Sequence, residues 1–165
     1  MQRYSLFPFP VNIRTVFRYL PCLALFIFSL GVTSSRAQEY TATFEHQAIV
    51  VSDLDKSAEF YQEVLGLQEV ENKTEKPTRR WFSMGEHLEL HLLLEEEMVS
   101  VNKYLHMALA VSNFDNFIQN LRDKKIPFYN WEGDPNKIKL RPDGVRQVYL
   151  QDPDGYWIEI NSNAP

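Results

Sequence analysis

The sequence predicts an α+β fold in which two βαβββ modules pair to form a concave mixed sheet, a half-barrel cleft with the helices on its outside. Three observations support this prediction. The segment HQAIVVSDLD, starting at His46, recurs as HMALAVSNFD from His106, with His, Ala, Val, Ser and Asp in register. A helical pattern of apolar residues follows each copy, and three strand-like segments follow each helix. We expect the modules at about residues 40–97 and 101–165.

Each expected helix begins directly after the repeated strand. In the first copy Ser52 or Asp53 can cap the helix, and Gly66 is the stop expected at its end. In the second copy Asn113 is the cap candidate, and Pro127 prevents much further helix. The helices therefore occupy corresponding places in the two modules.

The strands that complete each module are short and separated by residues typical of turns. After the first helix we expect strands at residues 67–73, 79–84 and 87–94. After the second helix we expect them at residues 126–131, 137–140 and 145–151, the last leading into 156–161. Charged residues scattered among these segments indicate sheets with one face open to solvent.

Residues 1–37 are expected to be a signal peptide. Arg3, Arg14 and Arg18 make a basic start without acidic residues, and an apolar run of 13 residues follows at 20–32. Ser35 and Ala37 have the small-residue spacing of a cleavage site, so cleavage is expected before Gln38. An uncleaved anchor is the alternative, but a bilayer span needs about 20 residues. The domain at 38–165 is then periplasmic or secreted, with no stable membrane insertion.

The composition of the expected mature chain excludes several kinds of function. Its only cysteine, Cys22, leaves with the leader, which rules out disulfides, thiolate nucleophiles and cysteine-bound zinc. The leader also carries four arginines and no acidic residue, so its loss changes the formal charge from −5 to −9. Such an acidic chain is not expected to bind nucleic acid. The expected partner is a small-molecule substrate.

Four polar residues occupy matching places in the duplicated modules. Alternation along the strands puts His46 and His106 on the face away from the helices, and Glu89 and Glu159 share that face near the end of each module. One His or Glu on a strand is usually a surface residue, but a duplicated pair favours a shared role. Two imidazoles and two carboxylates suit one divalent ion of Zn, Ni, Co, Mn or Fe.

The ligand from the end of the first module has alternatives. His87 and His91 lie two residues on either side of Glu89 and share its face, so either can replace or support it. Aligning Gly85 with Gly155 places Glu89 over Glu159 and His91 over Asn161. Because Asn161 is not a typical ligand, Glu89 is the first choice and His91 the alternative.

Two segments resemble the vicinal oxygen chelate superfamily, the group that contains glyoxalase I, bleomycin-resistance proteins and extradiol dioxygenases. They are SDLDKSAEFY at 52–61, running on to VLGL at 64–67, and DPDGYWIE at 152–159. The ligand pattern is most similar to bacterial glyoxalase I, where a His opens each module and a Glu closes it. The matching positions are His46, Glu89, His106 and Glu159.

The resemblance implies a metal-dependent lyase or isomerase acting on a small substrate that chelates the ion through two adjacent oxygens. Glu159 is then the expected base and Glu89 the second choice, with Arg141 and Trp157 as substrate-binding candidates. Val50 stands where bacterial glyoxalase I has an arginine that helps hold glutathione, so the resemblance does not extend to that substrate.

Two other functions remain compatible with the sequence. One is a ferrous dioxygenase of the same superfamily, and the other is a protein that binds a small ligand without turnover. In each case a module supplies only half of the site, so two modules must face each other. They can belong to one chain or to two, and we expect a homodimer.

Overall fold

The computed structural model describes residues 42–164, and those from Thr43 onward belong to one compact unit. The predicted signal peptide, its cleavage site and Cys22 lie outside the described residues. Within 42–164, no helix is long and apolar enough to cross a membrane.

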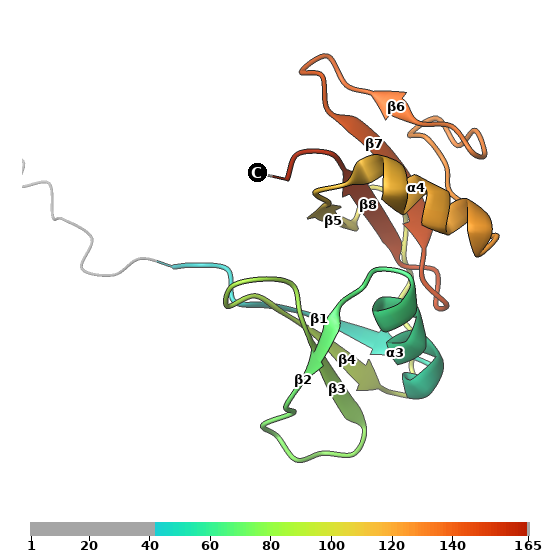
Figure 1. The fold of residues 1–165 in the computed structure, drawn as a ribbon. Coiled ribbons are helices and arrows are strands. Elements are labelled where there is room, and N and C mark those ends of the chain that lie inside the picture. Colours follow the sequence, from blue (N-terminus) through green and yellow to red (C-terminus); the bar gives the residue numbers. More distant parts are fainter. Residues whose placement is uncertain (1–41, 165) are drawn as a thin grey trace, which may run out of the picture. The chain divides into compact units, whose positions relative to one another are not determined.

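The first module forms a four-stranded sheet in the order β1-β4-β3-β2 (Figure 1). Strands β1 and β4 are parallel, whereas the other neighbours are antiparallel. Its elements are β1 (His46–Val51), α3 (Leu54–Glu63), β2 (Gln68–Val70), β3 (Arg79–Ser83) and β4 (Glu89–Leu94).

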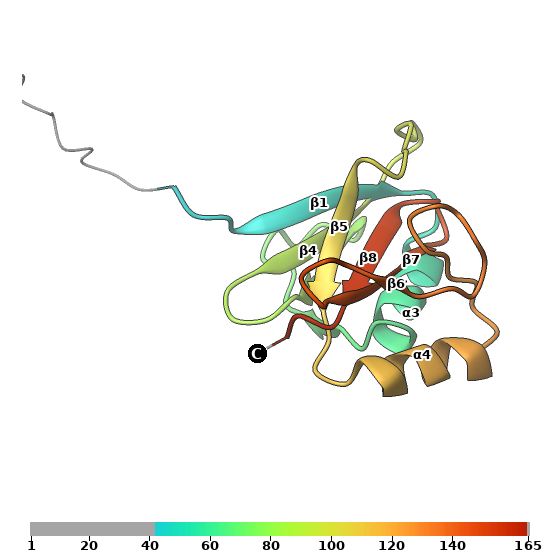
Figure 2. The ribbon, with the colours of Figure 1, turned by 90° about the horizontal axis from the view of Figure 1, so that it is seen from above.

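The second module repeats this topology with the order β5-β8-β7-β6. Its elements are β5 (His106–Ala110), α4 (Phe114–Asp123), β6 (Lys139–Leu140), β7 (Arg146–Gln151) and β8 (Trp157–Asn161). Both helices lie on the same side of the strands (Figure 2). Neither sheet closes on itself, so the predicted α+β fold of two βαβββ modules with an open half-barrel cleft is confirmed.

Two strand predictions were inaccurate. Residues 126–131 form no regular strand, although Tyr129 makes an isolated bridge to Tyr149 of β7. Pro127 has no amide hydrogen to donate, and Asn130 turns the chain back by bonding to Asp134. In the first module β4 starts at Glu89, so His87 lies in the preceding turn and is exposed.

Side-chain caps fix the starts of both helices as the sequence predicts. The Asp53 carboxylate accepts the amide of Lys56 at 3.0 Å, and the Asn113 side chain accepts the amide of Asn116 at 3.1 Å. Helix α3 ends at Glu63, before Gly66. The capped helices hold the ends of β1 and β5 in equivalent positions.

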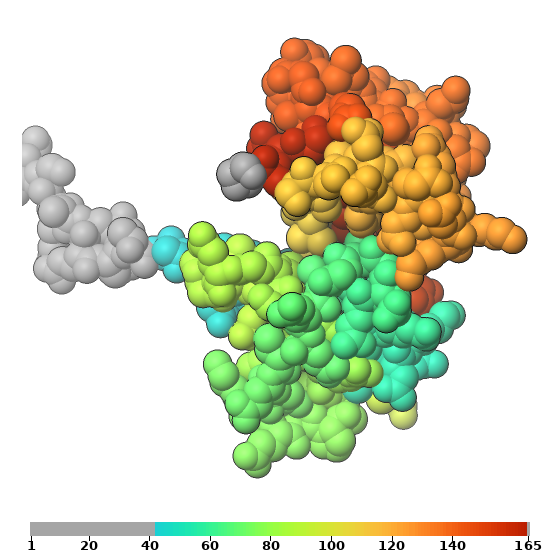
Figure 3. Space-filling view, in the orientation of Figure 1, coloured from blue at the N-terminus to red at the C-terminus, as the bar shows by residue number. Residues whose placement is uncertain are grey.

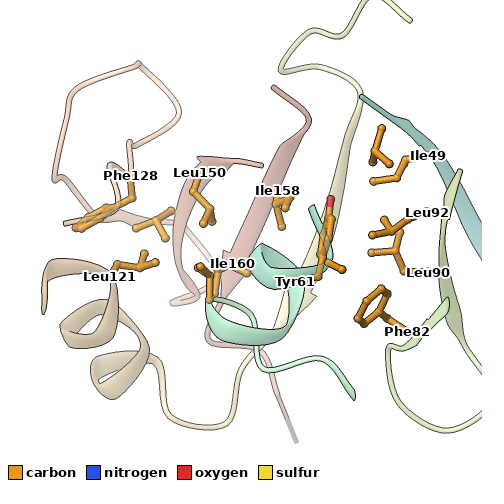
Figure 4. Packing of buried hydrophobic residues seen from close by; sticks show 14 of the residues in the cluster. Ile49, Tyr61, Phe82, Leu90, Leu92, Leu121, Phe128, Leu150, Ile158 and Ile160 are labelled. Carbon is orange, nitrogen blue, oxygen red and sulfur yellow. The ribbon is translucent and has the colours of Figure 1, made fainter. Parts of the chain in front are cut away.

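One hydrophobic core runs through both modules. Alternation along β1 is as predicted, because Ile49 and Val51 are buried while His46 and Ala48 are exposed. Tyr61 of α3 lies between the two groups of core side chains (Figure 4). These groups include Ile49, Phe82, Leu90 and Leu92 from the first module and Leu121, Leu150, Ile158 and Ile160 from the second.

Hydrogen bonds also join the two modules, which adjoin each other in Figure 3. The Tyr61 hydroxyl donates to Asp152 at 2.8 Å. The hydroxyls of Ser52 and Ser57 donate to Asp154 at 2.5 and 3.1 Å. The two sequence segments that resemble known proteins are therefore bonded to each other.

Candidate metal centre

The strand register shows which residues of the two modules are equivalent. In the first module His46 is paired with Glu89, and Ala48 with His91. In the second, His106 is paired with Trp157, and Ala108 with Glu159. If His46 and His106 are equivalent, the counterpart of Glu159 is His91, not Glu89.

The two hairpin turns explain this difference of two residues from the sequence alignment. Met84 bonds to Leu88 across the first turn, and Asp152 bonds to Tyr156 across the second. Glycine occupies the second position of the first turn (Gly85, φ 102°) but the fourth position of the second (Gly155, φ 88°). Both positions need a left-handed backbone, so the glycines mark different points of equivalent turns.

The first group of site candidates lies on β1 and β4. The His91 ring is stacked between Trp81, 4.0 Å away, and His46, 4.3 Å away. The Nε2 of His91 donates to Glu89 at 2.9 Å. The Nδ1 of His46 contacts the carboxylate of Glu45, so this carboxylate does not engage the other nitrogen of the His46 ring, Nε2. Because the rings of His46 and His91 are parallel, their in-plane lone pairs do not meet at one point.

The second group lies on β5, β7 and β8. Glu159 is 7% exposed, and both of its carboxylate oxygens accept hydrogen bonds. The Tyr149 hydroxyl donates to Oε2 at 2.6 Å, and the Asn161 amide donates to Oε1 at 2.9 Å. The Nε2 of His106 lies 3.5 Å from the same Oε2. This carboxylate is thus held in one position beside an imidazole.

Tyr149 and Lys103 set the electrostatics of this second group. Burial, together with its hydrogen bond to Glu159, raises the pKa of Tyr149 well above its ordinary value, so it remains a neutral donor. The Lys103 ammonium lies 4.4 Å from the centre of the Tyr149 ring and 5.0 Å from that of Trp157. Desolvation lowers the pKa of Lys103.

His46 and His106 share one feature that His91 lacks. The Nδ1 of His106 donates to the carbonyl oxygen of Lys103 at 2.8 Å, just as the Nδ1 of His46 faces Glu45. An acceptor on Nδ1 fixes the ring and leaves Nε2 as the donor atom for a metal, the usual arrangement of ligating histidines. In His91 it is Nε2 that is engaged.

The predicted ligands are brought together in two groups and not in one. His106 lies beside Glu159, and His46 lies beside His91, which in turn contacts Glu89. Among residues 42–164, no three His, Cys, Asp or Glu side chains are placed to share an ion. The four-ligand set of His46, Glu89, His106 and Glu159 remains a prediction.

The substrate-binding candidates lie near the second group. Arg141 pairs with Asp143 at 2.5 Å, and its charge slightly opposes the rise in the pKa of Tyr149. The ring of Trp157 faces Lys103. The partners of Glu159 were not predicted from the sequence, although Tyr149 stands directly opposite it in the sheet and Asn161 follows it by two residues on the same face.

The comparisons with known proteins agree with this architecture. The family model described as the Glyoxalase/Bleomycin resistance protein/Dioxygenase superfamily matches residues 43–160. The uncharacterised protein YwbC of Bacillus subtilis is 28% identical over 123 residues, covering 70% of this chain and 94% of YwbC. The metallothiol transferase FosB of Staphylococcus haemolyticus is 28% identical over 127 residues, covering 72% of this chain and 82% of FosB.

Solved structures show the same fold. A putative glyoxalase family protein from Bacillus anthracis has a TM-score of 0.61 at 25% identity, covering 75% of this chain and 97% of that protein. The fosfomycin resistance protein FosX from Mesorhizobium loti has a TM-score of 0.57 at 16% identity, covering 76% of this chain and 95% of that one.

Proposed function

Because the chain belongs to the glyoxalase/bleomycin resistance protein/dioxygenase superfamily, we propose that it is an exported, metal-dependent enzyme. Its substrates are small molecules that present two adjacent oxygens to a divalent ion. Its reaction is a lyase- or isomerase-type proton transfer.

The proposed ligands are the Nε2 atoms of His46 and His106 and the carboxylate of Glu159. The observation that carries this choice is the shared environment of the two histidines, each with an acceptor on Nδ1. Glu159 fits the same role because two donors already hold its carboxylate in one position. Two imidazoles and one carboxylate leave positions free for substrate on Zn, Mn, Fe, Co or Ni.

We assign proton transfer to Glu89, with His91 as its partner. This differs from the sequence expectation, in which both glutamates were ligands and Glu159 was also the first choice for the base, with Glu89 second. Glu159 is buried and bonded through both oxygens, whereas Glu89 contacts only His91 by a side-chain hydrogen bond and is less buried. A base must move between two atoms of the substrate, and Glu89 has that freedom.

The bound ion would supply Lewis acidity, which makes a carbon-bound proton next to the substrate oxygens easier to remove. Glu89 would take this proton and return it to the neighbouring carbon. His91 would donate to the Glu89 carboxylate from Nε2 and orient it toward the substrate. Tyr149, a neutral donor, would hold Glu159 in place throughout.

We further propose that two copies of the chain complete the site. The two candidate groups do not meet among residues 42–164, so a second copy would bring His46 of one chain to His106 of the other. Exposed apolar side chains lie next to both groups, with Phe44 60% exposed beside His46 and Leu105 75% exposed beside His106. Such side chains are typical of surfaces that a partner covers.

A ferrous dioxygenase is the second candidate. Two histidines and one carboxylate are the ligand set of many non-haem iron oxygenases. Metal analysis together with a measurement of dioxygen uptake separates the two functions, because an oxygenase requires iron and consumes dioxygen during turnover, whereas a lyase or isomerase consumes none. The alternative of ligand binding without turnover predicts no product from any compound tested.

The proposed site is tested by metal titration of the purified protein and its variants. His46→Ala and His106→Ala should each weaken metal binding by more than about 100-fold, since even the loss of a ligand's supporting partner costs 10- to 100-fold. His87→Ala is the matched control, because His87 is exposed in a turn, and it should bind metal normally. Stoichiometric metal in both ligand variants would refute the site. A screen of small α-hydroxycarbonyl compounds then tests the reaction.

A further inference from the structure

The side chain of Lys103 fastens the linker between the modules to the second module. Its Nζ donates to the carbonyl oxygens of Asn130 and Trp131 at 2.6 and 3.0 Å. The same ammonium lies 4.4 Å from the centre of the Tyr149 ring, 5.0 Å from that of Trp157 and 5.3 Å from that of Trp131. Two hydrogen bonds and three aromatic rings therefore hold one end of this residue in place.

The linker residues around Lys103 bury little surface that could hold this segment. Four of them are between 41% and 85% exposed, namely Met98, Val99, Tyr104 and Leu105. The Asn102 side chain accepts the amide of Tyr104 at 3.0 Å, but this bond stays within the linker. A segment with little buried surface opens easily. The position of the backbone here therefore depends strongly on the Lys103 side chain.

The backbone carbonyl of Lys103 determines which nitrogen of the neutral His106 ring carries the hydrogen. A carbonyl oxygen can only accept, so the Nδ1 that faces it at 2.8 Å must be the donor. Nε2 then holds the lone pair, which is the form that a metal ligand needs. A second acceptor competes for the hydrogen, because the Glu159 carboxylate lies 3.5 Å from Nε2 and would accept from it in the other tautomer.

We propose that the Lys103 side chain is a positioning residue, which holds its own carbonyl against Nδ1 of His106 and so keeps Nε2 free to bind an ion. Without this anchor the carbonyl would move away from the ring, and the Nε2–H tautomer would gain a hydrogen bond to Glu159. The hydrogen would then occupy the atom that the proposed metal centre needs. The tautomer of His106 is defined without any metal, and only its use in binding an ion rests on the proposed function.

The tautomer is measured from the ring-nitrogen chemical shifts of isotope-labelled, chelator-treated protein at about pH 8.5, where free imidazole is neutral. The signals of His106 are those that His106→Ala lacks. The wild type should show mainly the Nδ1–H form. Lys103→Met removes the N–H donors, so the ratio of Nδ1–H to Nε2–H should fall by about three- to tenfold, the value of one neutral hydrogen bond. Lys103→Gln, which is shorter and polar, should lower the ratio as well.

Tyr61→Phe controls for a general loss of stability, because it removes a hydrogen bond between the modules and none that involves the linker. It should leave the tautomer ratio of His106 unchanged. The Nε2–H form as the main species in the wild type would overturn the proposal without the use of any variant. An unchanged ratio in both Lys103 variants, or an equal fall in Tyr61→Phe, would overturn it too.

Metal titration separates a failure of the positioning role from a failure of the proposed function. Lys103→Met should weaken metal binding by about 10- to 100-fold, as the loss of a ligand's supporting partner does. If His106→Ala binds metal as tightly as the wild type, the proposed centre is wrong and the tautomer result still stands. If His106→Ala loses the metal while Lys103→Met binds it at full strength, the positioning role is wrong and the centre stands.

Discussion

The Tyr61 hydroxyl donates a 2.8 Å hydrogen bond to Asp152, 91 residues further along the chain. Tyr61 belongs to α3 of the first module, and Asp152 begins the turn between β7 and β8 of the second. Asp152 also accepts the amides of Asp154 and Tyr156, at 3.0 and 2.8 Å. Tyr61 and Asp152, one from each of the two segments that resemble known proteins, therefore hold the modules together, and neither is a proposed ligand.

Tyr61→Phe should destabilise the protein by about 1–3 kcal/mol, because it leaves a buried carboxylate oxygen without its donor. Chemical denaturation measures the change. Tyr104→Phe is the matched control, since Tyr104 is 85% exposed, and its effect should be close to zero. Equal effects of the two substitutions would show that the bond between the modules contributes nothing.

The buried position of Asp152 should also make stability depend on pH. Burial raises the pKa of Asp152, although its hydrogen bonds act in the opposite direction. At pH values between the ordinary pKa of an aspartate and the raised pKa of Asp152, the folded state binds more protons than the unfolded state. The contribution of Asp152 to the free energy of unfolding therefore falls as pH rises through this range. Asp152→Asn removes that contribution. The stability of the wild type relative to Asp152→Asn should decline as pH rises from about 4, and a constant difference would contradict the assignment.

Mixing two inactive variants distinguishes a site shared between chains from a site within one chain. If His46 and His106 of different chains bind one ion, a heterodimer of His46→Ala and His106→Ala contains one intact site and one that lacks both histidines. After subunit exchange an equal mixture should recover about one quarter of the wild-type metal content. No recovery, despite heterodimers seen by native mass spectrometry, would place the site within a single chain.

The two glutamates should respond differently to the same substitution. Glu89→Gln should keep the metal and lose about 10²- to 10⁴-fold in rate, the range for removal of a general base. Glu159→Gln should instead weaken metal binding. Glu86→Gln in the exposed turn is the control and should change neither property. The assignment made from the sequence, with Glu159 as base, predicts instead that Glu159→Gln retains much of the metal and loses about 10²- to 10⁴-fold in rate.

Export is tested directly by the mass of the protein recovered outside the cytoplasm. The basic start, the apolar run of 13 residues and the small residues before Gln38 predict a chain that begins at Gln38. A full-length protein held in the membrane as the sole product would exclude cleavage.

Much of this architecture could be predicted from the sequence because the duplication repeats its local signals. Asp53, Asn113 and the alternation of Ile49 and Val51 all act over a few residues, and each is found as expected. The equivalence of Glu159 and His91 was missed because Gly85 and Gly155 occur at different positions of matching turns. The two candidate groups were also expected to converge, but local patterns do not determine which modules face each other.

The two-residue offset between the closing strands has a stereochemical consequence. One wall of the proposed site carries the fixed carboxylate of Glu159. The equivalent place on the other wall carries the imidazole of His91, with Glu89 beside it. A strictly repeated chain would offer a substrate two interchangeable orientations and would deliver a proton to either face of a planar carbon. Unlike walls accept one orientation and expose one face, so an enzyme built on this frame would form a single enantiomer.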